Sequence, residues 1–194
     1  MIGLLGGAFN PPHNGHVELA RRALEEFDLE RLDVLVSGDP AHKHVDCPVD
    51  VRVDLAKLAF ADLPRTSVHA DPYRYTVDRL RAEPPLDDAI FLMGADQYRD
   101  FPTWKEPDAV LERVQLGVAT RAGVERPPLA VSHEGRVRFF EIDSPPIASR
   151  DLRARARRGE PLDGLVPAAV AAEIARGGLY RNGATLTAQF PEET

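Results

Sequence analysis

The chain has 194 residues, of which 43% are hydrophobic and 28% are charged, and this is the composition of an ordinary globular protein. Its formal net charge of −7 excludes a broad nucleic-acid-binding surface, and no apolar run reaches the roughly 20 residues that a membrane span needs. Cys47 is the single cysteine, so there is no internal disulfide framework, and we expect a cytoplasmic protein. The length predicts one domain, over residues 1–181, with residues 182–194 as a peripheral tail.

The first sixteen residues carry the most distinctive pattern in the chain. An apolar run over residues 2–5 predicts a buried strand, Gly6 and Gly7 allow the backbone to turn, and His13 and His16 fall where the next helix should begin. The start of a helix offers unpaired N–H groups and a positive dipole end, both of which suit a phosphate. An ordinary tight connection between strand and helix is the alternative, and the histidine spacing makes it less attractive.

Strands and helices then alternate along the chain. We predict strands at 32–36, 66–70, 89–93, 116–119 and 137–142, and helices at 17–27, 51–63, 75–80, 108–113, from 149, and 166–176. The polar residues 122–134 are interpreted as a surface connection. This alternation predicts a Rossmann-like, doubly wound α/β fold, with a mostly parallel sheet and helices on both faces. Ligands of such sheets bind at the carboxyl ends of the strands.

Four further side chains lie where they could meet a nucleotide. Lys43 is in the loop after the second strand, and Arg52 is in the first turn of the next helix, where it opposes the helix dipole unless an anion is present. Asp96 follows a strand end and Gly94, so it could accept ribose hydroxyls, although capping of a helix is an equally simple explanation. Trp104, between two prolines, could stack on an aromatic ligand, although most tryptophans are core residues.

A second anion site is predicted near residue 149. Ser149 is a natural N-cap, and Arg150, Arg153 and Arg157 follow at offsets of three and four on one helical face, although a solvated arginine face is the alternative. No nucleophile elbow, zinc-protease helix motif or phosphate-binding loop of the Walker type is present. The reaction class that remains after these exclusions is phosphoryl or nucleotidyl transfer, in which the protein positions the reactants and stabilises charge.

The stretch His13-Asn14-Gly15-His16 is similar to the His-x-Gly-His signature of the adenylyl- and cytidylyltransferase superfamily. Further stretches along nearly the whole chain, at 6–13, 40–43, 75–78, 94–97, 102–105 and 166–180, together resemble bacterial nicotinate mononucleotide adenylyltransferases. The resemblance implies attack by the 5′-phosphate of nicotinate mononucleotide on the α-phosphorus of ATP, with Mg²⁺ on the phosphates, which yields deamido-NAD and pyrophosphate. Its partners would be these two nucleotides, with no nucleic acid or membrane, and it leaves a homo-oligomer open.

The same resemblance implies three sets of site residues. The catalytic set is His13, His16 and Lys43. The set that binds ATP is Gly6, Gly7, Ala8, Phe9, His13, His16, Gly94, Asp96, Ile147, Ser149, Arg150 and Arg153. The set that binds the acceptor is Lys43, Arg52, Tyr75, Thr76 and Trp104. No protein side chains are expected to bind the metal directly.

Two segments depart from the family pattern. The second phosphate signature commonly reads Ile-Ser-Ser-Thr-x-Ile-Arg, and here Ala148 and Arg150 replace a serine and the threonine. Arg74 stands in a segment where Gly-Pro-Ser is expected, and it would favour nicotinate over nicotinamide. Two alternatives follow: a related nucleotidyltransferase whose acceptor is nicotinamide mononucleotide or pantetheine phosphate, and a nucleotide sensor that binds without turnover.

Overall fold

The structure is a computed structural model, and it describes residues 1–40, 45, 47–82, 84, 86 and 88–181. The strands are β1 (Ile2–Gly7), β2 (Arg31–Ser37), β3 (Thr66–Asp71), β4 (Ala89–Gly94), β5 (Gln115–Arg121) and β6 (Val137–Ile142). The α-helices are α1 (Asn14–Glu26), α2 (Val49–Phe60), α3 (Thr76–Ala82), α4 (Ala95–Asp100), α5 (Pro107–Arg113), α6 (Ser149–Arg157) and α7 (Ala168–Gly177). Two short 3₁₀ helices are η1 (Phe101–Thr103) and η2 (Val131–His133).

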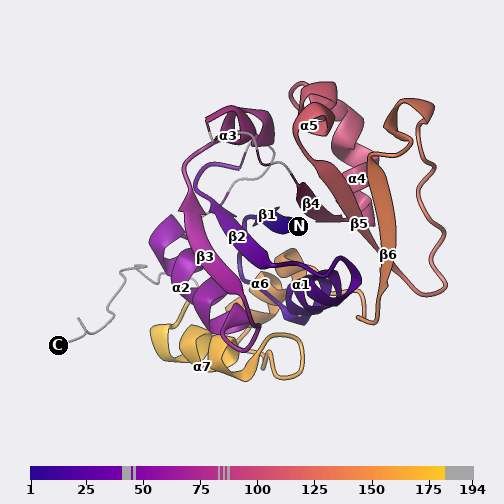
Figure 1. Ribbon diagram of the computed structural model, residues 1–194. Coiled ribbons are helices and arrows are strands. Elements are labelled where there is room, and N and C mark those ends of the chain that lie inside the picture. Colours follow the sequence, from indigo (N-terminus) through magenta and orange to yellow (C-terminus); the bar gives the residue numbers. More distant parts are fainter. Residues whose placement is uncertain (41–44, 46, 83, 85, 87, 182–194) are drawn as a thin grey trace.

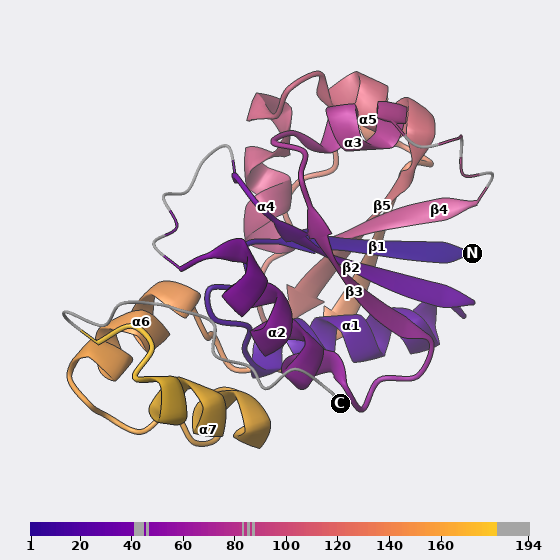
Figure 2. The ribbon, with the colours of Figure 1, turned by 90° about the vertical axis from the view of Figure 1, so that its left-hand side faces the viewer.

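The six described strands form one sheet in the order β3-β2-β1-β4-β5-β6, and every pair is parallel. This order is that of a doubly wound sheet, and it reverses direction between β1 and β4. Helices α1 and α2 cover one face together with α6 and α7, whereas α3, α4 and α5 cover the other (Figures 1 and 2). The prediction of a Rossmann-like α/β fold with helices on both faces is therefore confirmed.

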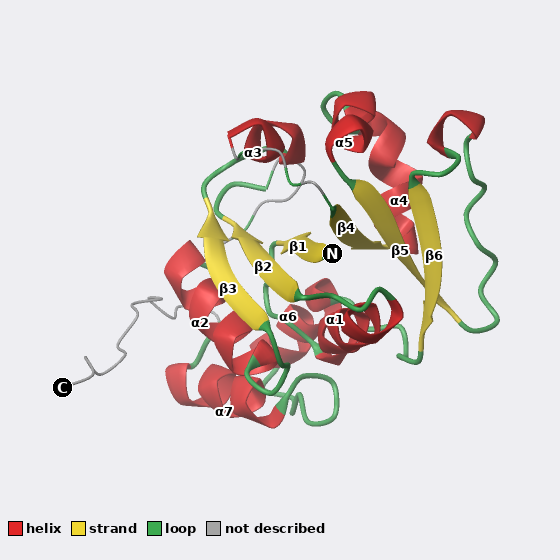
Figure 3. Cartoon of the chain, viewed as in Figure 1, coloured by secondary structure: helices red, strands yellow, loops and turns green. Residues whose placement is uncertain are grey.

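Each face of the sheet has its own apolar core. The residues of β4, AIFLMG, are buried almost throughout, because a central parallel strand is covered on both sides. Leu92 and Val34 belong to the core cluster that contains residues of α1 and α2, whereas Met93 and Leu116 belong to the cluster that contains residues of α3, α4 and α5. Figure 3 shows these two groups of helices on opposite faces of the sheet. The sheet thus provides a rigid platform whose carboxyl ends carry the connecting turns.

The sequence predictions differ from the structure at the last helix, at the segment after β4 and at the connection 122–134. The last helix begins at Ala168 rather than at residue 166, because Pro167 has an extended ψ of 146° and serves as the N-cap. Helix α4 and the 3₁₀ helix after it were not predicted, since a run of only six residues leaves little periodicity to detect. The connection at 122–134 is not wholly superficial, because His133 is buried.

Candidate active site

The turn between β1 and α1 lies at the reversal of the strand order. Strand β1 pairs with β2 on one side and with β4 on the other, so its carboxyl end is central in the sheet. Phe9, just beyond the strand, has a left-handed φ of 46° and is buried against Phe60. This is the position at which doubly wound sheets bind their ligands.

The two histidines of the turn are in direct contact. Their rings are stacked with centroids 3.6 Å apart, and the Nδ1 atom of His16 accepts the backbone N–H of His13 at 3.2 Å. An Nδ1 atom that accepts a hydrogen bond requires the tautomer with its proton on Nε2, so His16 carries its donor on Nε2. A Cβ atom on Gly15 would lie 3.1 Å from Nδ1 of His13 and 3.2 Å from Oγ of Ser144, which explains the glycine between the histidines.

His13 is a neutral imidazole at physiological pH. Burial lowers its pKa from the ordinary 6.5 to about 4, and the positive charge of Arg121 acts in the same direction. Its Nδ1 atom is buried and has no hydrogen-bond partner among the described residues. The turn is therefore arranged for hydrogen bonding and charge stabilisation rather than for proton abstraction.

The lowered pKa of His13 predicts a loss of stability in mild acid. The unfolded chain takes up the proton near pH 6.5 and the folded chain only near pH 4, so the contribution is complete above pH 6.5 and decreases as the pH falls toward 4. At pH 4.5 we expect a loss of about 2.5 kcal/mol in the free energy of unfolding from this group. Urea denaturation of the wild type and of His13→Gln between pH 7.5 and 4.5 measures it. Equal pH dependence in the two proteins would contradict the assignment.

Helix α6 is attached to the histidine turn from the other end of the sequence. Ser149 Oγ donates to the carbonyl of Pro11 at 2.9 Å, and Arg153 Nη1 donates to the carbonyl of Asn10 at 2.7 Å. The prediction that Ser149 is the N-cap was wrong: Ala148 takes that place, and Ser149 uses its hydroxyl to bind the turn instead of its own helix. The start of α6, where the second anion site was expected, thus lies beside the first one.

Arg52 lies deeper than the sequence suggested. Its side chain is fully buried, and its Nη1 atom donates to the carbonyls of Ala8 at 2.7 Å and Ser37 at 2.8 Å, while Nε donates to Cys47 at 2.9 Å. The guanidinium therefore ties the carboxyl ends of β1 and β2 to the beginning of α2. These carbonyls supply acceptors that offset the unfavourable position of the arginine in the helix.

A cavity of about 400 Å³ opens beside the carboxyl end of β1, within the size range of small-ligand sites. It is lined by six of the predicted residues, namely Gly6, Gly7, Ala8, Tyr75, Thr76 and Trp104. Trp104 is half-buried and meets Phe91 edge to face, at a centroid distance of 6.0 Å. Thus the structure brings the glycine turn and the predicted aromatic residues together around one space.

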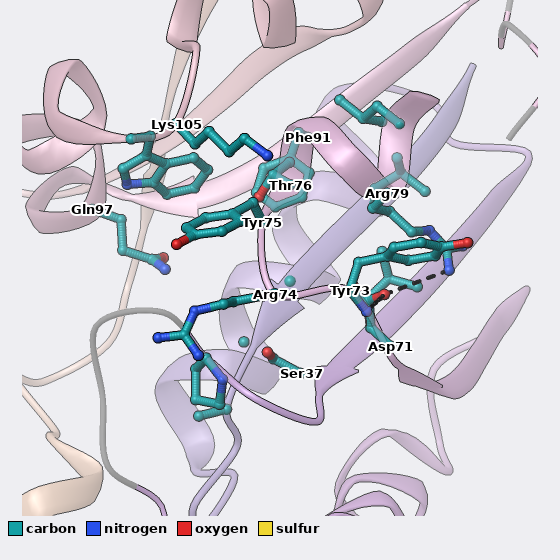
Figure 4. Close-up of a pocket in the computed structure, with 18 of the residues that line it drawn as sticks. Ser37, Asp71, Tyr73, Arg74, Tyr75, Thr76, Arg79, Phe91, Gln97 and Lys105 are labelled. Carbon is teal, nitrogen blue, oxygen red and sulfur yellow. Dashed lines mark hydrogen bonds and ion pairs between the residues drawn. The ribbon is translucent and has the colours of Figure 1, made fainter. Parts of the chain in front are cut away.

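The cationic side chains of the cavity are each beside a carboxylate. Arg74 bonds Asp39 at 2.5 Å, Lys105 bonds Asp78 at 2.9 Å, and Arg79 is 3.8 Å from Asp71. Figure 4 shows Lys105 and Gln97 on one side of Tyr75 and the pair of Asp71 and Arg79 on the other. The side chains of the Arg74 pair are half or more exposed, and those of the Lys105 pair are partly exposed. Ion pairs at the surface contribute only about 0 to 1 kcal/mol, so an anionic ligand can replace these carboxylates.

Three other predicted residues of the described part, Asp96, Ile147 and Arg150, do not line the cavity. Asp96 has a side chain that is 87% exposed and pairs with Arg99 at 2.6 Å; it is not the N-cap of α4, because Gly94 is. Arg150 is largely exposed and lies near Asp151. Ile147 is half-buried and packs on the core, and Lys43 lies outside the described residues.

Gly94 has a different explanation from the glycines of β1. A Cβ atom on Gly6 would lie 2.8 Å from the ring of Phe91, so packing alone requires that glycine. A Cβ atom on Gly94 would meet nothing within 4 Å, and its φ of −80° is accessible to any residue. The absence of a side chain at Gly94 therefore keeps open space at the carboxyl end of β4.

Sequence reasoning missed several residues of the site. Ser37, Asp71, Arg79 and Lys105 line the cavity and carry polar or charged groups. Ser37 and Asp71 are the last residues of β2 and β3, Arg79 lies within α3, and Lys105 belongs to the stretch 102–105, of which only Trp104 was assigned a role. A search for polar residues immediately after each predicted strand would have found Ser37 and Asp71.

Among the described residues, no three His, Cys, Asp or Glu side chains are grouped so that they could hold a metal ion. No described helix has the length and apolar character to span a membrane.

Comparisons with known proteins give the family and the fold of the chain. The cytidylyltransferase-like family model matches residues 4–155, from β1 into α6. A solved structure described as Plasmodium falciparum nicotinic acid mononucleotide adenylyltransferase complexed with NaAD superimposes with a TM-score of 0.77, at 14% sequence identity, over 92% of this chain and 96% of that chain. At this identity the structural likeness shows the fold alone.

Two curated relatives are much closer in sequence. A protein described as a probable nicotinate-nucleotide adenylyltransferase from Thermomicrobium roseum is 36% identical over 211 residues, covering 100% of this chain and 96% of the relative. One of the same description from Thermus thermophilus is 37% identical over 191 residues, covering 93% of this chain and 99% of the relative. The chain therefore belongs to the cytidylyltransferase-like family, among its nicotinate-nucleotide adenylyltransferases.

Proposed function

We propose that this protein transfers the adenylyl group of ATP to nicotinate mononucleotide and releases pyrophosphate, a step of NAD biosynthesis that we place in the cytoplasm. The observation that carries the proposal is the position of the cavity. Its wall includes Gly6, Gly7 and Ala8, the residues that lead into the turn of His13 and His16. An acceptor nucleotide in the cavity would therefore have its phosphate next to the site suited to ATP's phosphates.

The contacts of the cavity fit a pyridine nucleotide. Trp104 and Tyr75 offer aromatic faces, and Arg74, Arg79 and Lys105 offer cations for an acid group or a phosphate. Thr76 is the first residue of α3, so the backbone at Tyr75 and Thr76 can donate to a carboxylate. We assign the acceptor to this cavity.

The reaction needs positioning and charge stabilisation more than covalent chemistry. An oxygen of the acceptor phosphate attacks the α-phosphorus of ATP, and the bond from that phosphorus to the pyrophosphate oxygen breaks. His16 donates from Nε2 to an α-phosphate oxygen as negative charge develops, and neutral His13 supports the same group. Ser149 and Arg153 hold the turn in the geometry that this requires.

A divalent metal would accompany the nucleotide. The described residues contain no cluster of potential ligands, so we write Mg²⁺ as part of the ATP substrate, bound through the phosphates. When present, it withdraws charge from the phosphate oxygens. Of the remaining predicted residues, Asp96 and Gly94 are proposed near the ribose, Phe9 and Ile147 along the nucleotide path, and Lys43 and Arg150 at the phosphates.

One assay tests the proposed function. Purified protein is mixed with ATP and Mg²⁺, and pyrophosphate release is followed with nicotinate mononucleotide, nicotinamide mononucleotide or phosphopantetheine as the acceptor. We expect the highest kcat/KM with nicotinate mononucleotide and formation of deamido-NAD. A higher value with another acceptor would reassign the substrate, and ATP binding without pyrophosphate release for any acceptor would favour the sensor instead.

Arg74 is expected to favour the acidic acceptor. Its guanidinium lines the cavity and is held there by an exposed pair with Asp39, from which a ligand carboxylate can take it. Arg74→Ala should lower kcat/KM for nicotinate mononucleotide by about tenfold, the cost of one exchanged charged hydrogen bond, and should leave nicotinamide mononucleotide nearly unchanged. Asp39→Asn is the matched control, since it frees the same guanidinium. An unchanged ratio between the two acceptors in Arg74→Ala would contradict this assignment.

A further inference from the structure

Arg121 is the last residue of β5 and lies at the same carboxyl edge of the sheet as the histidine turn. In the pairing of β5 with β6 it stands opposite Ile142. Two residues after Ile142, Ser144 reaches the start of α1, where its Oγ would lie 3.2 Å from a Cβ atom on Gly15. The end of β6 therefore connects the position of Arg121 to the turn that carries the histidines.

One hydrogen-bond donor of the Arg121 side chain is not used within the described part of the protein. Its Nε atom is buried and has no hydrogen-bond partner among the described residues. A buried N–H without an acceptor is costly, and such groups in native proteins call for an explanation. Arg121 as a whole is only partly buried, so a guanidinium whose Nε–H lacks an acceptor can still bind an anion that reaches it.

The histidine turn also contains buried polar atoms without hydrogen-bond partners among the described residues. Asn10 Oδ1 and His13 Nδ1 are also buried and without partners among the described residues, and the charge of Arg121 is close enough to His13 to lower its pKa. Three of the five described polar atoms of this kind thus belong to the turn or to the arginine that acts on it. A single ligand rich in acceptor oxygens, bound between them, would satisfy the two nitrogen groups together.

We propose that Arg121 is a phosphate-binding residue of the ATP site, and that it contacts the triphosphate on the side of the turn that faces β5. This inference rests on the proposed function, because it takes the histidine turn to be the triphosphate site. The guanidinium can donate two parallel hydrogen bonds to phosphate oxygens. The negative charge that develops on the leaving pyrophosphate is then stabilised by the guanidinium of Arg121 at the end of β5, in addition to the side chains of the turn.

The test uses Arg121→Ala, Arg121→Lys and, as a matched control, Arg126→Ala. Arg126 is the next arginine after β5, is 58% exposed and pairs only loosely with Glu141 at 3.5 Å. We expect Arg121→Ala to lower kcat/KM for ATP about 100-fold, the usual effect of removing one donor to the transition state. Arg121→Lys should recover part of this loss because it keeps the charge, and Arg126→Ala should stay within twofold of the wild type.

Two measurements on the free protein separate binding from folding. Because Arg121 has no acceptor to lose, the Tm of Arg121→Ala should equal or exceed that of the wild type. Added pyrophosphate should raise the Tm of the wild type and of Arg126→Ala, and raise it much less in Arg121→Ala. The inference would be overturned if Arg121→Ala had a strongly lowered Tm and its folded fraction had the activity of the wild type. Arg121 would then contribute to stability and not to phosphate binding.

Failure of the inference and failure of the proposed function give different results. If the wild type is active with nicotinate mononucleotide, and Arg121→Ala keeps kcat/KM for ATP within threefold and responds equally to pyrophosphate, the inference is wrong and the function stands. If the wild type releases no pyrophosphate with any acceptor, the function is wrong. In that case the Tm is measured with and without ATP. If ATP raises the Tm of the wild type but not that of Arg121→Ala, the phosphate site is supported. If ATP raises the Tm of both proteins equally, the phosphate site is refuted.

Discussion

Replacing His16 with alanine should lower kcat by about three orders of magnitude, with a much smaller change in the KM for either nucleotide. The reason is that His16 Nδ1 is already used by the backbone N–H of His13, which fixes the donor on Nε2 and directs its contribution to charge that appears only in the transition state. Removal of such a donor costs roughly 100- to 1,000-fold in kcat. Pyrophosphate release under saturating ATP and nicotinate mononucleotide measures the effect.

The control for this prediction is a histidine that lies on a strand of the sheet. His69 lies on β3 and its side chain is 57% exposed, so His69→Ala should keep the wild-type rate. His16→Asn keeps an N–H donor on a shorter side chain and should retain more activity than His16→Ala. If His16→Ala turned over at more than a tenth of the wild-type rate, the assignment of His16 as the charge-stabilising residue would have to be abandoned.

Replacing Arg52 with alanine should reduce the free energy of unfolding by about 3 kcal/mol or more. The substitution removes the donor from the carbonyls of Ala8, Ser37 and Cys47, and it leaves a void where the buried arginine side chain was. Unpaired buried carbonyls and a cavity both destabilise the folded state. Urea denaturation monitored by far-ultraviolet circular dichroism gives the difference.

Two further variants separate the causes. Arg52→Met retains most of the side-chain volume but no donor, so it should recover the cavity contribution and not that of the hydrogen bonds. Lys57 lies on the same helix, is 60% exposed and pairs with Asp54, so Lys57→Ala should change stability by less than about 0.5 kcal/mol. A loss below about 1 kcal/mol in Arg52→Ala would show that the three carbonyl contacts contribute little.

The fold was predictable because its signal is local and repeated. The buried runs of β1, β2 and β4 and the amphipathic periodicity of α1 are each visible within a few residues, and a parallel sheet follows from strands separated by helices. The short elements were not predictable in this way. Helix α4 has six residues, and its conformation depends on the buried Tyr98 packing against Phe101 rather than on a period.

The candidate site divides along the same line. The turn with His13 and His16 could be located from its glycines and its spacing, since a strand end followed by a helix start is a local event. The hydrogen-bond partners of single side chains could not be predicted from the sequence, because burial in the folded protein decides them. Arg52 and Arg153 were both read as anion-binding arginines, yet their guanidinium groups donate to carbonyls of distant turns. Arg121 carries no motif at all.

The sequence by itself determined the order of the strands and of the α-helices other than α4, the glycine and histidine turn, and the resemblance to nicotinate mononucleotide adenylyltransferases, because each depends on patterns within short runs of consecutive residues. Only the tertiary structure decided which arginine side chains already have hydrogen-bond acceptors within the protein and which do not. Ser149 lies 138 residues from the carbonyl that it binds, and Arg52 lies 44 residues from the carbonyl of Ala8. Hydrogen-bond partners and desolvation are set by residues that the fold brings together, and no local pattern encodes them.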